Sequence, residues 1–155
     1  GIGGGFVGQA EVGSIVIATE MIAADLGVET SSGFQPIETL NFGNSRITAE
    51  TEISEKVYHR LRKSSVPVNK GSILTLSTVT GTSSTLEELL RRVPNAVAEA
   101  MEGYGVALAA QRFQLPVIEI RTISNLVGPR DRNNWKLKEA IELLTQVSSE
   151  IKEVI

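Results

Sequence analysis

The sequence contains no cysteine, and His59 is its one histidine. Disulfide bonds and thiolate metal sites are therefore excluded, and so is a histidine-rich metal site. No apolar run reaches the roughly 18 residues that a membrane-spanning helix needs, and we expect no signal peptide. The net charge of −3 gives no electrostatic reason to expect nucleic acid or an anionic membrane as a partner. We expect a cytoplasmic protein that acts on a small molecule without a metal or a cofactor.

The residues that are present fit one ordinary globular domain, with 41% apolar and 21% charged residues in a chain of 155. The chain opens with the glycine cluster Gly1-Ile2-Gly3-Gly4-Gly5, with no initiator methionine and no strand before it. Such a cluster normally follows a strand and lets the backbone approach a ligand closely. We therefore expect a single domain over residues 1–155 that is N-terminally truncated.

Apolar runs and amphipathic segments alternate along the sequence. Continuous β-branched and apolar residues predict strands over residues 12–19, 72–79 and 115–124, with residues 20–28 as an extension of the first. Helical spacing predicts helices over residues 48–63, 85–92 and 135–155, with Thr48 or Thr51 capping the first and Thr85 opening a capping box in the second. Gly, Pro, Ser and Asn predict a loop over residues 30–44.

Residues 95–113 fit two interpretations. Their alanines favour one long helix, whereas Gly103 and Gly105 favour a short strand over residues 96–100 and a helix after Glu102. Under either interpretation strands alternate with helices, which predicts a layered α/β fold with a largely parallel or mixed sheet.

Three polar features follow the predicted strands, namely Thr80-Gly81-Thr82, Met101-Glu102 and Ser124-Asn125. In open α/β sheets, ligands bind beyond the carboxyl ends of the strands, so we expect these features to converge on one site. Arg130 follows closely and is either part of an exposed charged loop or a clamp for a carboxylate.

Glu102 and Asn125 are the sharpest candidates. On periodicity alone Glu102 is a solvent-facing helix residue, but its carboxylate could also accept two hydrogen bonds from a sugar diol. Asn125 is either a turn-former or a recognition group, because its amide offers a donor and an acceptor to the edge of a purine.

The segments Ala100–Ala107 and Pro116–Asn125, with the glycine cluster and the strand that follows it, resemble the nucleoside phosphorylase/nucleosidase superfamily. Within it, residues 124–132 and 80–82 are most similar to the futalosine hydrolases, enzymes of an alternative menaquinone route. The resemblance covers essentially the whole chain. It implies a three-layer α/β/α fold with a mixed central sheet, a homo-oligomer, and hydrolysis of futalosine to hypoxanthine and dehypoxanthine futalosine.

The resemblance also implies residue roles. Glu102 would hold the ribose 2′ and 3′ hydroxyls, Met101 would pack against the sugar, and Asn125 would contact the departing base. Adenine-specific members have an aspartate at the last position, and a neutral amide there suits a 6-oxopurine. Further substrate-binding positions would be Gly3, Gly4, Thr80, Gly81 and Arg130.

The family's general base is a glutamate on a strand before the glycine cluster, and no part of this chain matches it. We therefore expect the 155-residue chain alone to release little or no hypoxanthine. The alternatives are a purine nucleoside phosphorylase, an adenosine-type nucleosidase, and a nucleoside-binding module that is inactive because the base is absent.

Overall fold

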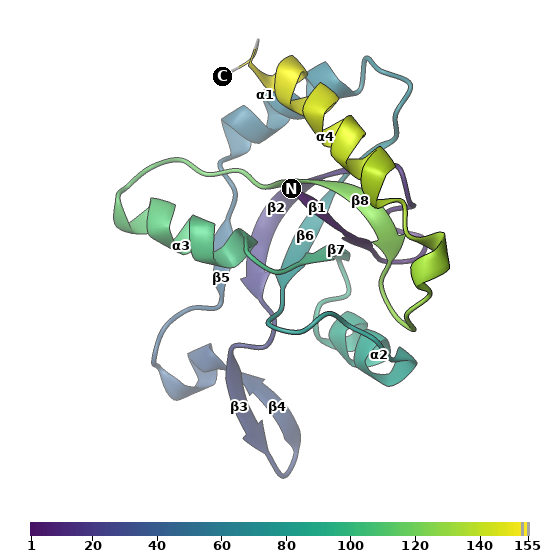
Figure 1. Cartoon of the computed structure of the whole chain (residues 1–155). Coiled ribbons are helices and arrows are strands. Elements are labelled where there is room, and N and C mark those ends of the chain that lie inside the picture. The colour runs from purple at the N-terminus through teal and green to yellow at the C-terminus, as the bar shows by residue number, and fades with distance from the viewer. Residues whose placement is uncertain (153, 155) are drawn as a thin grey trace.

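The computed structural model describes residues 1–152 and 154 and is built around one mixed β-sheet (Figure 1). The strand order is β5-β2-β6-β7-β1-β8, and β8 also pairs with β2, so that the sheet closes on itself. Neighbours are parallel in β2–β6, β6–β7 and β1–β8 and antiparallel in β1–β7, β2–β8 and β2–β5. The strands are β1 (Ile2–Gly5), β2 (Ile15–Ala23), β5 (Arg46–Thr48), β6 (Val68–Thr75), β7 (Ala96–Ala100) and β8 (Ile120–Leu126). The predicted mixed sheet is confirmed, whereas its closure was not predicted.

Helices lie on both sides of this sheet, as the three-layer expectation requires (Figure 1). Successive side chains of β2 point to opposite sides of the sheet. Ile15 and Ile17 pack with Val57 and Val147 of α1 and α4, whereas Val16 belongs to a cluster that includes residues of α3. The helices are α1 (Thr51–Leu61), α2 (Ser83–Arg92), α3 (Gly103–Arg112) and α4 (Leu137–Ile151). The three-layer α/β/α fold is confirmed.

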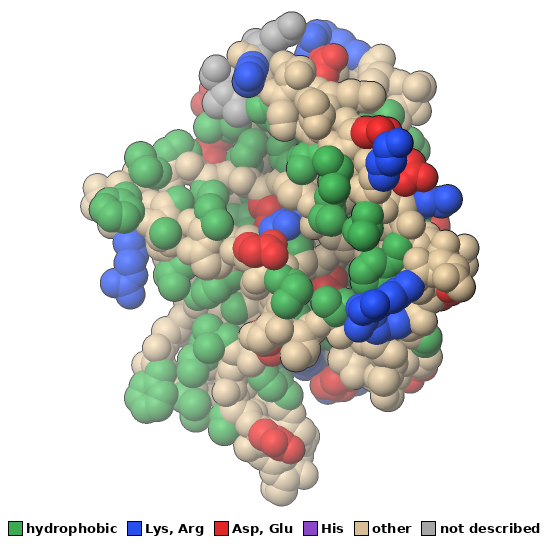
Figure 2. Space-filling model, in the orientation of Figure 1, with side chains coloured by type: hydrophobic (Ala, Val, Ile, Leu, Met, Phe, Trp, Pro, Cys, Tyr) green, Lys and Arg blue, Asp and Glu red, His purple; other side chains and the backbone are tan. Residues whose placement is uncertain are grey.

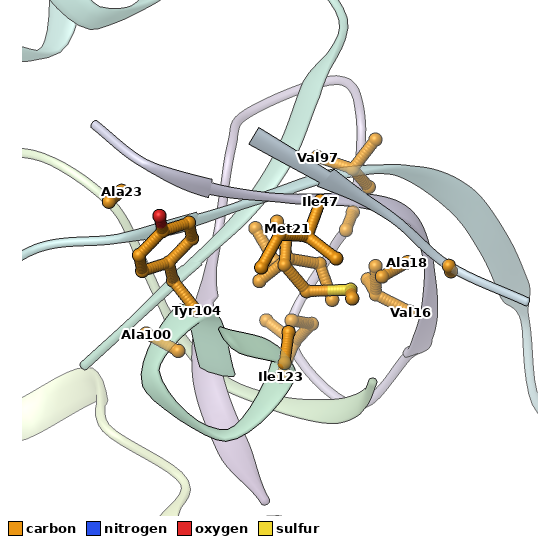
Figure 3. Close-up of a cluster of buried hydrophobic side chains, with 14 residues drawn as sticks. Val16, Ala18, Met21, Ala23, Ile47, Val97, Ala100, Tyr104 and Ile123 are labelled. Carbon is orange, nitrogen blue, oxygen red and sulfur yellow. The ribbon is translucent and has the colours of Figure 1, made fainter. Parts of the chain in front are cut away.

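The central hydrophobic cluster fills the interior between the strands and α3 (Figure 3). Val16, Met21 and Ile123 are fully buried in it, and Tyr104 brings the first turn of α3 against the same side chains. Full burial of each such aliphatic side chain contributes about 1.5–3 kcal/mol, so this cluster fixes the strands that carry the candidate site.

Several predicted boundaries differ from the structure. The strand predicted over residues 12–19 begins at Ile15 and continues to Ala23, and those predicted over 72–79 and 115–124 are shifted to β6 and β8. The second interpretation of residues 95–113 is correct, because β7 and α3 are separate elements on either side of Met101-Glu102.

Helix ends and one loop also need correction. The N-caps of α1 and α2 are Glu50 and Thr82 rather than Thr48, Thr51 or Thr85. Residues 30–44 are not all loop, because β3 (Gly27–Thr30) and β4 (Gly33–Pro36) form a hairpin that is followed by the 3-10 helix η1 (Ile37–Leu40). A second 3-10 helix, η2 (Arg132–Asn134), precedes α4, and of the helix predicted to reach residue 155, positions 153 and 155 lie outside the described residues.

Across residues 1–152 and 154, no helix combines the length and apolar character needed to cross a membrane. The same residues hold no group of three or more His, Cys, Asp or Glu side chains placed to bind a metal ion.

Candidate active site

A cleft of about 240 Å³ runs across the backbone of β1, between β7 and β8. Glu102 lies at the Ile2 end, where Arg121 bonds to both residues. Asn125 lies at the Gly4 end, where the two residues pair. Figure 2 shows hydrophobic side chains gathered on the face of the molecule that it presents, with a few acidic and basic groups among them. The apolar part of the cleft wall comes from Val79, Met101, Trp135 and Leu137.

The strand directions explain how the two ends come together, and they correct the expected reason. β7 runs antiparallel to β1 while β8 runs parallel to it. Met101-Glu102, which follow β7, and Asn125, which lies near the end of β8, therefore belong to strands that point in opposite directions. They do not share one edge of the sheet. They line the same cleft because β1 lies between β7 and β8 and the cleft runs across β1.

Glycines form the floor of the cleft because side chains there would collide with its walls. A Cβ on Gly4 would lie 3.0 Å from Val127 Cγ2 and 3.1 Å from Asn125 Nδ2. A Cβ on Gly3 would lie 2.8 Å from the backbone oxygen of Glu99. The glycine cluster at the start of the chain is therefore a strand that lets β7 and β8 approach closely.

Glu102 is the N-cap residue of α3, but its side chain makes no capping hydrogen bond. Instead Arg121 Nη1 donates to Glu102 Oε2 at 3.0 Å, and this nitrogen also lies 3.1 Å from the Ile2 carbonyl oxygen. The Glu102 side chain is 66% exposed, whereas that of Arg121 is 9% exposed. A buried guanidinium thus holds one oxygen of a carboxylate that opens toward the cleft.

Behind Arg121 lies a second carboxylate. Arg121 Nε donates to Glu119 Oε1 at 2.7 Å, and the side chain of Glu119 is buried. Burial raises the pKa of Glu119 above its usual range, while the charge of Arg121 acts in the opposite direction. Glu119, Arg121 and Glu102 therefore form one continuous chain of charges, which we name the Glu102 cluster.

At the other end, a β-bulge directs two consecutive side chains to the cleft. Gly3 pairs with Ile123 and Gly4 with Asn125, so Ser124 is the extra residue of β8. In a regular strand, successive side chains point to opposite faces, but here both Ser124 and Asn125 line the cleft.

The bulge also fixes the Asn125 amide. The Ser124 hydroxyl lies 2.9 Å from Asn125 Oδ1, to which it can donate, and Asn125 Nδ2 donates to the Leu126 carbonyl at 3.0 Å. An amide has two N–H groups and two acceptor lone pairs, so one of each remains for a ligand. We name Ser124 and Asn125 the Asn125 pair.

Glu99 is a second buried carboxylate and lies in the wall of the cleft. Its two oxygens accept hydrogen bonds from the backbone N–H and the hydroxyl of Thr80. Burial raises the pKa of Glu99, and these hydrogen bonds oppose that rise. Thr80 is thus held behind the wall of the cleft rather than in its lining.

The structure brings five of the sequence-predicted site residues to the cleft lining, namely Gly3, Gly4, Met101, Glu102 and Asn125. Gly81 and Arg130 lie beside each other but are not among the lining residues. The Arg130 guanidinium carbon lies 5.4 Å from the centre of the Trp135 ring, which does line the cleft.

Sequence reasoning missed Glu119, Arg121 and Glu99. A signal existed for the first two, because they occupy alternate positions of an otherwise apolar run and so share one face of the chain. Charged residues on a buried face are rarely found unless they are paired. Glu99 gave no comparable signal, since its partner Thr80 is 19 residues away.

The family model of the phosphorylase superfamily matches residues 1–155. The chain belongs to the phosphorylase superfamily. Futalosine hydrolase of Streptomyces coelicolor is 44% identical over 155 residues, which are 100% of this chain and 64% of that protein. Futalosine hydrolase of Acidothermus cellulolyticus is 43% identical over 144 residues, or 93% of this chain and 59% of that protein. This phosphorylase-superfamily chain therefore spans about three-fifths of the length of these relatives.

Solved structures agree on the phosphorylase-superfamily fold. The 5′-methylthioadenosine/S-adenosylhomocysteine nucleosidase of Neisseria meningitidis, in complex with methylthio-immucillin-A, has a TM-score of 0.85 at 22% identity, covering 100% of this chain and 68% of that one. Native futalosine hydrolase of Helicobacter pylori also has a TM-score of 0.85, at 17% identity, covering 100% of this chain and 66% of that one. At such identities the likeness supports the fold alone.

Proposed function

We propose that this chain carries the ribose-binding and base-binding groups of a nucleosidase that hydrolyses the N-ribosidic bond of a 6-oxopurine nucleoside. The substrate we propose is futalosine, which would yield hypoxanthine and dehypoxanthine futalosine. One observation carries the proposal: a carboxylate and a neutral amide face a single cleft from its two ends, across a floor of glycine backbone.

The Glu102 end suits a ribose. Glu102 Oε2 is held by Arg121, and within residues 1–152 and 154 no hydrogen bond is found to the other oxygen, Oε1. A carboxylate with free lone pairs can accept from two neighbouring hydroxyls, as the 2′ and 3′ hydroxyls of a ribose require. Met101, which also lines the cleft, would pack against the apolar side of the sugar.

The Asn125 end suits a 6-oxopurine. The free N–H of the Asn125 amide can donate to O6 or N7 of hypoxanthine, and the amide is neutral, so it carries no charge that would repel an oxo group. An aspartate at this position would accept rather than donate, as a 6-amino edge requires. The neighbouring Ser124 hydroxyl, which also lies 3.2 Å from the Gly3 carbonyl oxygen, favours the orientation of the amide in which Oδ1 accepts from it at 2.9 Å.

The reaction follows from these two contacts. The bond between C1′ and the base breaks and its electron pair leaves with the base. The N–H of Asn125 stabilises the charge that develops there until the base takes up a proton from solvent. Positive charge develops on the ribosyl group, which is held beside the carboxylate of Glu102. A water then attacks C1′ and loses its proton to a general base, which we assign to none of the residues in this cleft.

The curated relatives support futalosine over other substrates. The two that are 43–44% identical are futalosine hydrolases, whereas a 5′-methylthioadenosine/S-adenosylhomocysteine nucleosidase of Desulfotalea psychrophila is 26% identical over 156 residues. The second candidate function is therefore an adenosine-type nucleosidase. Asn125 disfavours it, because by resemblance the adenine-specific members have an aspartate at this position.

Chromatographic measurement of hypoxanthine released from futalosine tests the proposal, with the protein produced from its complete gene. We expect release without added phosphate. A requirement for phosphate would instead identify a phosphorylase, and release of adenine from methylthioadenosine without release of hypoxanthine would favour the second candidate. Tight binding of futalosine by calorimetry without any turnover would identify a nucleoside-binding module.

We also propose that the protein assembles as a homo-oligomer. Large apolar side chains are exposed on and after α3, including Val106 at 62%, Phe113 at 77% and Leu115 at 60%. An exposed apolar patch of this kind is a common site of protein association. Light scattering of the purified protein tests the proposal, and a monomeric mass at micromolar concentration would contradict it.

A further inference from the structure

Glu119 is a buried carboxylate that the proposed reaction does not use. Its backbone carbonyl accepts from Ala18 of β2 at 2.9 Å, and its side chain is 8% exposed. Removing a charge from water is costly, and a hydrophobic residue of similar size is often no less stable at such a site. The burial of Glu119 therefore suits a role in orienting other groups better than a role in stability.

The two oxygens of Glu119 have different surroundings. Oε1 accepts from Arg121 Nε, whereas Oε2 is buried and lacks a hydrogen-bond partner among the described residues. The carboxylate lies against the first residue of α3, where a Cβ on Gly103 would come within 2.1 Å of it. Among the described residues, the one side-chain hydrogen bond that this carboxylate accepts therefore comes from Arg121.

Arg121 transmits that contact to Glu102. A guanidinium is planar and rigid, so a hydrogen bond that fixes Nε also fixes the direction in which Nη1 points. Nη1 is the atom that donates to Glu102 Oε2, at 3.0 Å. The position of Glu119 therefore determines where Arg121 holds the cleft carboxylate.

The charge of Glu119 affects Glu102 as well as the direction in which Arg121 points. Arg121 carries one positive charge between two carboxylates. Because Glu119 neutralises Arg121, Glu102 keeps its negative charge available for other donors. Without Glu119, the guanidinium would draw Glu102 into a closer pair and weaken it as an acceptor.

We propose that Glu119 is a positioning residue for ribose recognition, which acts through Arg121 to present Glu102 to the 2′ and 3′ hydroxyls of the substrate. This inference rests on the proposed function, because it takes the ligand of Glu102 to be a ribose. It adds to that function a buried determinant of the preference for ribonucleosides over 2′-deoxynucleosides.

The test compares futalosine with its 2′-deoxy analogue in wild type, Glu119→Gln and Glu119→Leu, using the protein produced from its complete gene. Gln keeps an acceptor for Arg121 Nε and removes the charge, whereas Leu removes both. We expect Glu119→Gln to lower the ratio of the two kcat/KM values by about tenfold, equivalent to about 1.4 kcal/mol. Glu119→Leu should lower it further, with the loss falling on futalosine and mainly on KM.

Glu38→Gln is the matched control. Glu38 also has one oxygen bonded, to the N–H and hydroxyl of Ser45 at 2.6 and 2.7 Å, and one buried oxygen without a partner in the described part of the chain. It lies in η1 and does not line the cleft, so its substitution should leave the ratio at the wild-type value. Thermal unfolding of every variant checks that the fold is retained.

A double substitution separates positioning from a general structural effect. If Glu119 acts only through Glu102, Glu119→Gln should cause no further loss of ribose preference in a Glu102→Gln background. Equal losses on both substrates, or an unchanged ratio in a folded Glu119→Gln protein that cleaves futalosine, would overturn the inference alone. Absence of any cleavage or binding of futalosine by the wild type would overturn the proposed function as well.

Discussion

At one end of the cleft, Glu102 pairs with Arg121, which pairs in turn with Glu119; at the other end, Asn125 is held by the Ser124 hydroxyl and the Leu126 carbonyl. The Glu102 cluster is a chain of full charges, two of them buried, and charge interactions in such surroundings act over several ångströms. The Asn125 pair is neutral, and its hydrogen bonds act at contact. A change at the charged end should therefore propagate along the cluster, whereas a change at the neutral end should stay local.

Removal of the cleft carboxylate should have the largest effect. Glu102→Gln keeps the shape of the side chain but removes the charge that faces the developing ribosyl cation, and it leaves Arg121 paired with Glu119 alone. We expect kcat/KM for futalosine to fall about 100-fold, the scale seen when one charge-stabilising group is removed from an active site. Steady-state kinetics measure this, and unchanged kinetics would remove Glu102 from the site.

Gly103→Ala tests whether the charged end propagates disturbance. The new Cβ would lie 2.1 Å from a Glu119 oxygen, so the carboxylate must move and carry Arg121 with it. We expect a loss of about 1–3 kcal/mol in the free energy of unfolding, measured with urea, together with a weaker preference for ribonucleosides.

Gly105→Ala provides the control for this prediction. Gly105 lies two residues further along α3, and a Cβ there would meet nothing within 4 Å. Alanine favours a helix over glycine, so Gly105→Ala should leave the protein equally stable or slightly more stable. If both substitutions lowered stability equally, the collision with Glu119 would not be the cause.

Asn125→Asp tests the neutral end. The carboxylate cannot donate to O6 or N7, so we expect the preference for a 6-oxopurine over a 6-aminopurine to fall by about tenfold, equivalent to about 1.4 kcal/mol. The preference for ribose over 2′-deoxyribose should stay at the wild-type value, because among the described residues no hydrogen bond or ion pair joins the Glu102 cluster to Asn125. Release of hypoxanthine and of adenine from matched nucleosides measures the change, and an unaltered base preference would count against a contact with the base.

The two ends of the cleft also show which features can be predicted from the sequence. Asn125 was identified because its amide follows a buried, predicted strand and suits a purine edge. Glu102 was ambiguous on periodicity and took its role mainly from the resemblance to the nucleoside phosphorylase/nucleosidase superfamily. The mixed sheet followed from the alternation of strands and helices. These features depend on residues close together in the sequence, where periodicity is visible.

The remaining features depend on pairing between strands that are far apart in the sequence, and no local sequence pattern reveals such pairing. β1 consists of Ile2 and three glycines, which have no side chains to show a period of two, so it was not predicted as a strand. The bulge at Ser124 exists only because β8 pairs with β1, more than 100 residues earlier in the chain. The closure of the sheet through β2 and β8 likewise depends on a pairing that no local pattern encodes.

The smallest predicted effect concerns the two buried glutamates of the cleft, Glu119 in the Glu102 cluster and Glu99 in the cleft wall. Burial raises the pKa of both Glu99 and Glu119, against the hydrogen bonds of Thr80 in the first case and the charge of Arg121 in the second. Between the ordinary value of 4.5 and the raised pKa, the folded protein binds more protons than the unfolded chain, so stability is full at lower pH and falls as the pH rises through this window.

Glu99→Gln should remove the part of this decrease in stability with rising pH that Glu99 causes. The amide can still accept from the Thr80 N–H and can donate to its hydroxyl, so the loss of stability at pH 4.5 should be about 1 kcal/mol or less. Urea unfolding between this pH and neutrality measures the slope, which should be shallower than in the wild type. Because Glu99 bonds to neutral groups and Glu119 to a guanidinium, Glu99→Gln should leave the preference for ribose intact while Glu119→Gln lowers it. If Glu99→Gln lowered that preference as much as Glu119→Gln does, charge would not distinguish the two ends of the cleft.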